Sequence, residues 1–275
     1  MDKDYEKCCK EIEFISSSAM SGFQKSLEEY RQEINRFKKG IATIECYDLV
    51  KKSFKQMIKT FMQKLPGEQR SIKGWRLFQI VFIVSLLPEV IRCEYPDDEM
   101  IREADEEIAE LLYFPTGGGK TEAFLGVCVF SMFFDRYRGK ADGVTAFLKY
   151  PLRLLAVQQL DRVLTIVTKA NIIKNLDPEI KSMTDFAVGF YVGKNNTPNK
   201  IDKSERLSSR AEENNYQNPV IIESTESQLD EWYRFIDTCP NCGKKMVHVR
   251  FNQEEWKLEH ICDNEECNTT VLPLY

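Results

Sequence analysis

The sequence has no run of about 18 uncharged apolar residues, the length that a membrane-spanning helix requires. It also has no excess of basic residues, because 43 acidic residues outnumber 38 lysines and arginines and leave a net charge of −5. The amino terminus is charged from its second residue, unlike a secretory signal peptide. We therefore expect a cytoplasmic protein with no membrane partner, in which any contact with nucleic acid is a local patch.

What is present is an ordinary globular composition. The 275 residues are 43% hydrophobic and 29% charged, which is enough to bury the core of one large domain or up to two smaller ones. No internal repeat is evident. The nine cysteines are expected to be cytosolic thiols or metal ligands, because a disulfide framework belongs to secreted chains.

Two helical segments are expected in the first third of the chain. Residues 46–65 carry an amphipathic stripe, typical of a helix that packs against the rest of a protein. The apolar members of this stripe are Leu49, Phe54, Met57, Ile58, Phe61 and Met62. After a break at Pro66-Gly67, residues 75–91 are strongly apolar and predict a buried helix that Pro88 closes.

Beyond residue 108, strand-like and helix-like segments alternate. This order predicts an α/β fold in which helices cover a parallel sheet. Residues 194–219 are polar and nearly devoid of aliphatic side chains, so they predict a loop. The expected strands are 108–114, 143–150, 185–193 and 220–224, and the expected helices are 121–138 and 152–170.

A glycine-rich turn separates the first expected strand from the helix after it. Such a turn presents backbone N–H groups at a helix N-terminus, and glycine lets the backbone approach phosphate oxygens closely. The lysine can reach the outer phosphates of ATP, and the following threonine hydroxyl can ligate Mg²⁺. The expected nucleotide-binding residues are Thr116, Gly117, Gly118, Gly119, Lys120 and Thr121. No catalytic residue is assigned beyond Lys120, which would stabilise the phosphates.

The stretch FPTGGGKT resembles the Walker A motif of superfamily-two helicases, in which the first position, here Phe114, varies. A second block, YPLRLLAVQQ, resembles motif Ia of the same superfamily, although Leu152 and Leu154 depart from it. The positions that match are Pro151, Arg153, Leu155, Ala156 and Gln158. This resemblance implies that Arg153 and Gln158 contact the sugar-phosphate backbone of DNA, and a guanidinium suits bidentate phosphate contacts.

A third match lies upstream, where WRLFQ has the R-x-x-Q arrangement of many such helicases. The resemblance implies that the Gln79 amide reads adenine, because an amide offers both a donor and an acceptor. The alternative is that this segment is simply a buried helix with one polar residue, and the sequence leaves both interpretations open.

Four cysteines near the C-terminus have the spacing of a zinc site. Two close pairs, C-x2-C and C-x4-C, are separated by nineteen residues. Such pairs supply the four soft ligands that Zn²⁺ prefers, and Gly243 suits the tight turn after the first pair. The expected ligands are Cys239, Cys242, Cys262 and Cys267, with His260 or His248 as possible replacements for one of them. So small a module has little core of its own, so the metal would supply folding energy.

In this order, the motifs resemble the large helicase of the DISARM anti-phage system (DrmA-type) over residues 45–275, most closely over 75–165. The resemblance implies a RecA-like ATPase fold that binds ATP, Mg²⁺ and DNA and acts in antiviral defence. The expected domains are an N-terminal helical region at 1–70, a RecA-like nucleotide-binding domain at 71–235 and a zinc ribbon at 236–275.

A helicase motor also needs a Walker B strand that ends in paired carboxylates. Neither PDDEM nor the Asp230-Glu231 pair follows a buried strand, and Glu223 stands alone after one. We therefore expect the front half of a DNA helicase or translocase, with an incomplete P-loop sheet, that binds ATP but does not hydrolyse it efficiently alone. Its partners would be DNA, the other half of a split helicase or further defence-system subunits.

Two other functions remain open. The first is a non-catalytic, nucleotide-switched subunit that binds nucleic acid, which differs from a motor by the missing Walker B carboxylates. The second is a P-loop kinase with a zinc-bearing lid. Phe114 at the usual glycine position, the long helical preface and the motif Ia block all disfavour the kinase.

Overall fold

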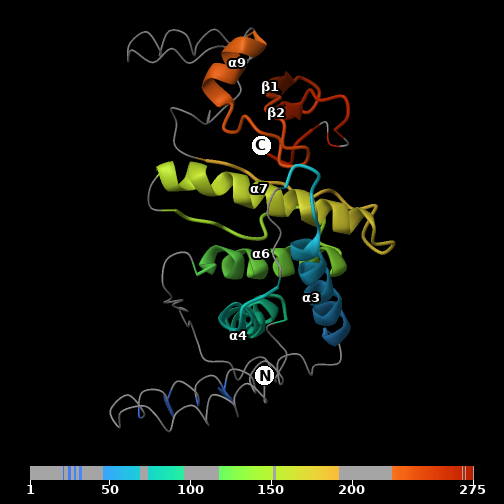
Figure 1. The fold of residues 1–275 in the computed structure, drawn as a ribbon. Coiled ribbons are helices and arrows are strands. Elements are labelled where there is room, and N and C mark those ends of the chain that lie inside the picture. The colour runs from blue at the N-terminus through green and yellow to red at the C-terminus, as the bar shows by residue number, and fades with distance from the viewer. Residues whose placement is uncertain are drawn as a thin grey trace, which may run out of the picture. The chain divides into compact units, whose positions relative to one another are not determined.

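The computed structural model describes residues 46–68, 74–95, 118–150, 153–191, 225–267, 269 and 271–274, with isolated positions between 21 and 32. The chain forms two compact units, Met1–Lys52 with Trp75–Val127 and Ser53–Gly74 with Cys128–Tyr275. In the described residues the fold mixes helices with a small two-stranded antiparallel sheet (Figure 1). In chain order the described elements are α3 (Tyr47–Met62), α4 (Leu77–Glu94), α6 (Lys120–Tyr137), α7 (Arg153–Asn175), α9 (Glu226–Tyr233), β1 (Val247–Asn252) and β2 (Lys257–Cys262).

Helix α4 carries the core of the first unit. The expectation that Pro88 closes this helix is wrong, since α4 continues through it to Glu94. A proline removes one backbone hydrogen bond, but Leu87 and Ile91 on either side of it are fully buried, and their packing holds the last turns together. The start of α6 packs on α4 in this unit. The rings of Phe82 and Phe124 meet edge to face there, with their centroids 5.2 Å apart.

Helix α7 carries the core of the second unit. It is buried on most sides, and even the ammonium of Lys174 lies inside, where it donates to the Met183 carbonyl at 2.6 Å and pairs with Asp185. The Asp177 carboxylate ties neighbouring segments to its C-terminal end, because it accepts hydrogen bonds from Tyr137 of α6 and Gln56 of α3. The amphipathic stripe of α3 is confirmed in part: Met57 and Phe61 are buried, whereas Met62 is 70% exposed.

The expected parallel sheet is not seen in the part of the chain that the structure describes. Residues 143–150 form no strand, and Phe147 on that segment is 90% exposed. Residues 185–191 contribute one parallel bridge, between Val188 and Leu274. The other two expected strands, 108–114 and 220–224, lie outside the described residues. A pattern of apolar residues favours an extended backbone, but a strand also requires a neighbour to bond with.

The one sheet among the described residues is a hairpin of β1 and β2. The strands are antiparallel, with Val247 opposite Cys262 and Asn252 opposite Lys257. Helix α9 packs on β1 through a small core of Leu229, Tyr233 and Val249 (Figure 1). None of the described helices combines the length and the apolar character needed to cross a bilayer.

Candidate metal centre and phosphate-binding turn

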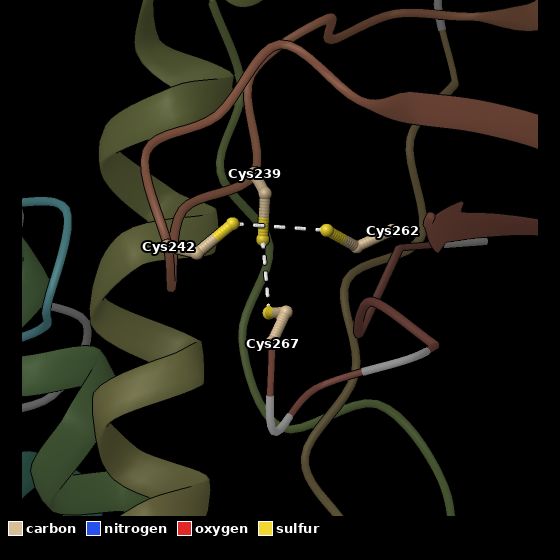
Figure 2. A group of neighbouring side chains, drawn as sticks. All are labelled: Cys239, Cys242, Cys262 and Cys267. Carbon is tan, nitrogen blue, oxygen red and sulfur yellow. Dashed lines mark hydrogen bonds between the residues drawn. The ribbon is translucent and has the colours of Figure 1, made fainter. Parts of the chain in front are cut away.

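The four predicted cysteines converge on one point (Figure 2). All four sulfur atoms lie within 4.8 Å of one another. The Sγ atoms of Cys239 and Cys267 are 3.8 Å apart, and those of Cys242 and Cys262 are 3.7 Å apart. Four thiolates bound about 2.3 Å from one Zn²⁺ stand about 3.8 Å apart at the corners of a tetrahedron. The sulfur positions therefore fit a single tetrahedral zinc ion.

Local backbone structure places these sulfurs. In the first pair, the Cys239 N–H donates to the Lys244 carbonyl and the Gly243 N–H donates to the Cys239 carbonyl, which closes a tight loop. Gly243 has φ +73°, so the expected need for glycine in this turn is confirmed. In the second pair, Cys262 is the last residue of β2, and the Cys267 N–H donates to the Asn264 carbonyl.

The thiols differ in acidity. Burial raises the pKa of Cys239 and of Cys262. Burial also opposes ionisation of Cys242, but the backbone N–H of Lys244 and the neighbouring thiols outweigh it and lower the pKa of Cys242 to about 7. A divalent cation favours the deprotonated form of every ligand, and it would offset the cost of ionising the buried thiols.

The two histidines are engaged elsewhere. His260 is buried and its Nε2 bonds the Tyr233 carbonyl at 3.1 Å. Burial lowers the pKa of His260 to about 4, so the ring is neutral near pH 7. His248 bonds the Asp230 carboxylate through Nδ1 at 2.7 Å. In the described part of the chain the candidate ligand set is therefore the four cysteines without a histidine.

The cysteine module shares its core with α7. Leu160 and Leu164 of that helix pack in one buried cluster with Cys239, Cys262 and other residues of the module. The remaining buried members of this cluster are Ile236, Val247, Leu272 and Leu274. The sequence indicated a small module with little core of its own, and the structure adds that a face of α7 completes this core.

A loop after α3 also braces the first cysteine pair, which the sequence did not indicate. The Gly67 N–H donates to the Asn241 carbonyl at 2.9 Å. A Cβ on Gly67 would lie 2.3 Å from the backbone nitrogen of Gly243, so the two glycine backbones are in direct contact. The sequence of Pro66-Gly67 by itself predicts only a break between helices.

Replacing Gly67 with alanine is expected to destabilise the protein by about 1–3 kcal/mol, because backbone atoms cannot yield to the new methyl group cheaply. Urea denaturation of the variant measures this loss. Gly74→Ala is the matched control, since a Cβ at Gly74 meets nothing within 4 Å. Equal stability of the Gly67 and Gly74 variants would contradict the close contact.

The glycine turn that is predicted to bind phosphate is described from Gly118 onward, whereas Thr116 and Gly117 lie outside the described residues. Gly119 has φ +92°, a left-handed conformation that favours glycine, and Lys120 is the first residue of α6. Thr121 follows in the first turn of that helix. The predicted junction between glycine turn and helix is confirmed for these residues.

Two side chains at the start of α4 hold this turn. Arg76 donates from a guanidinium nitrogen to the Gly118 carbonyl at 2.8 Å. Gln79 donates from Nε2 to the Gly119 carbonyl at 2.7 Å and accepts the Arg76 N–H through Oε1 at 2.8 Å. The residues of the R-x-x-Q pattern therefore contact the glycine turn, a pairing that the sequence analysis did not predict.

The remaining predicted site residues lie on α7 and α9. Helix α7 begins at Arg153, and Gln158 is exposed in its second turn. Asp230 and Glu231 lie within α9, and the Asp230 carboxylate accepts the Val249 N–H at 2.6 Å. Both acidic residues therefore lie in a helix and do not directly follow a strand. Glu223 lies outside the described residues.

Comparison with known proteins identifies a relative. No protein-family model and no solved structure matches the chain. Among curated proteins, the DISARM protein DrmA of Bacillus paralicheniformis is 32% identical over an alignment 221 positions long, and the alignment covers 73% of this chain and 18% of DrmA. The chain is therefore a DrmA-type DISARM relative that spans less than a fifth of the length of DrmA.

Proposed function

We propose that the turn at Gly118–Lys120 binds the phosphates of ATP together with Mg²⁺, as the nucleotide site of a DISARM defence protein. The observation that carries this proposal is the left-handed Gly119 directly before Lys120 and an 18-residue helix. A helix N-terminus offers unpaired N–H groups and a positive dipole end to an anion. Lys120 and Thr121 then stand at the positions that reach the outer phosphates and Mg²⁺.

The proposed fold around this site is a RecA-like parallel sheet. Support comes from the order of elements, in which the predicted strand 143–150 lies between α6 and α7 and forms neither helix nor strand in the described residues. Val144 and Phe147 on this segment are 68% and 90% exposed, which is costly for apolar side chains unless neighbouring strands or helices cover them.

The proposed nucleic-acid partner is DNA, contacted at the start of α7 by Arg153 and Gln158. A helix N-terminus with an arginine and an exposed amide suits backbone phosphates, which fix position without reading sequence. Because the chain carries a net charge of −5, this binding should be weak and should fall steeply as salt rises. Helicase or translocase activity is proposed for the longer assembly to which these residues would contribute.

The packing of the cysteine module helps to separate the proposed helicase part from a P-loop kinase with a zinc-bearing lid. A kinase lid must open and close, whereas this module shares a buried core with Leu160 and Leu164 of α7. That arrangement favours a fixed support over a lid. A motor and a nucleotide-switched subunit differ in turnover, so phosphate release with and without DNA separates them: stimulation by DNA favours the motor.

Replacing Lys120 with alanine is expected to weaken ATP binding at least about tenfold, since one charge-assisted contact contributes about 1.5–3 kcal/mol. The fold should persist because the lysine begins the helix and lies outside the core. Calorimetric titration with MgATP measures the affinity. Lys55→Ala, which removes an exposed lysine from α3, is the control. Equal affinity of wild type and Lys120→Ala for MgATP would contradict the proposed nucleotide site.

A further inference from the structure

Consecutive carbonyls of the glycine turn are held by side chains from one helix end. The Gly118 carbonyl accepts from Arg76 at 2.8 Å, and the Gly119 carbonyl accepts from Gln79 at 2.7 Å. These bonds join segments 42 and 40 residues apart in the chain. The second of these carbonyls belongs to Gly119, the left-handed glycine that precedes Lys120, and the first belongs to the residue before it.

Because the peptide bond is planar, the direction of each held carbonyl also sets the direction of the next backbone N–H group. In a trans peptide the C=O and the following N–H point in opposite directions. Holding the Gly118 carbonyl toward Arg76 therefore directs the Gly119 N–H the other way, and holding the Gly119 carbonyl directs the Lys120 N–H likewise. N–H groups at the first turn of a helix are those that bind anions, so their directions decide how well a phosphate is bound.

The Gln79 amide is itself fixed. Its Oε1 accepts the N–H of the N-cap residue Arg76, and the side chain is only 5% exposed. A Cβ on Gly119 would lie 2.6 Å from Nε2, so the amide occupies the space beside this glycine. A base-reading amide must meet a ligand edge, whereas this one is 5% exposed and already bonds the protein backbone through both Nε2 and Oε1.

We propose that Arg76 and Gln79 are positioning residues that preset the phosphate-binding turn, so that they raise affinity for the phosphate chain whatever base is attached. This inference rests on the proposed nucleotide site. It differs from adenine reading by Gln79, which would raise affinity for ATP over GTP. An equal loss of affinity for ligands with different bases therefore distinguishes the positioning role from adenine reading.

The test is titration of the full chain with MgATP, MgGTP and magnesium tripolyphosphate. Arg76→Met and Gln79→Met are expected to weaken all three ligands by a similar factor of about ten, the loss typical of one hydrogen bond to a charged or buried partner. Arg76→Lys retains the charge and is expected to weaken all three by a smaller, equal factor. Arg92→Met, at the other end of α4, is the control and should bind as wild type.

Backbone amide exchange at Gly119 and Lys120, measured without ligand, adds a readout that base recognition would not move. Faster exchange in Gln79→Met with an unchanged melting temperature supports the positioning role. A loss confined to ATP, or wild-type affinity in both methionine variants, overturns it while leaving the nucleotide site intact. If wild type binds none of the three ligands, the proposed function fails as well. Arg76→Lys keeps the test decisive if Arg76→Met does not fold.

Discussion

Replacing Cys242 with serine is expected to remove one equivalent of bound zinc and to unfold the β1–β2 hairpin. Two sulfur pairs at 3.8 and 3.7 Å match the edge of a tetrahedral zinc site, and all four sulfurs lie within 4.8 Å of one another, whereas a serine hydroxyl is a poor substitute for a thiolate. Structural zinc contributes about 10–16 kcal/mol to the folding of zinc-finger peptides, so its loss exceeds the stability of most domains. Metal analysis of the purified protein and thermal melting measure the two effects.

Because the cysteine module shares its core with α7, loss of zinc should also destabilise that helix. Leu160 and Leu164 lose their partners when the cysteine module unfolds, so protection from amide exchange should fall along α7 as well. Cys93→Ser is the matched control, because Cys93 is exposed on α4 and lies outside the cluster. Wild-type protein that carries no zinc, with its four clustered thiols open to alkylation, would contradict the metal centre.

Replacing Glu68 with glutamine is expected to lower the free energy of unfolding by about 2–3 kcal/mol, because it leaves a buried ammonium without its counter-charge. Lys169 lies on α7 with its side chain 4% exposed, and its Nζ is 2.7 Å from Glu68 Oε1. The Glu68 side chain is 18% exposed, so solvent screening holds the loss below that of a fully buried pair. Urea denaturation measures the change.

The double variant Lys169→Met/Glu68→Gln should recover most of this loss, because an apolar side chain in place of the lysine removes the unpaired charge. Lys245→Met is the exposed comparison: its pair with Asp237 has exposed fractions of 78% and 55%, so no measurable change is expected. Glu68 closes the loop that places Gly67 against Gly243, so Glu68→Gln should also speed zinc release to a chelator. Unchanged stability and zinc release in Glu68→Gln would show that the pair does not brace the loop.

The sequence alone determined the features that depend on a few neighbouring residues. The spacing of the cysteines indicated the ligand set, and the glycines before Lys120 indicated a turn that opens a helix. Periodic apolar residues predicted α6 within one residue of its observed bounds, and they predicted the start of α7, which continues to Asn175 beyond its predicted end at residue 170. Each cysteine pair and the glycine turn lie within one tight loop, and each helix is marked by a repeat of three to four residues, so local backbone geometry and side-chain spacing suffice to specify them.

Only the tertiary structure decided which distant segments meet. The bond from Gln79 to Gly119 spans 40 residues and the pair of Lys169 with Glu68 spans 101, and no local pattern marks either partner for the other. Tertiary packing also decided the length of α4, which continues past Pro88 because buried neighbours hold its last turns. Residues 143–150 have the apolar pattern of a strand but form none among the described residues. The physical reason is that burial, pairing and carbonyl orientation depend on what packs alongside, and those neighbours come from remote parts of the chain.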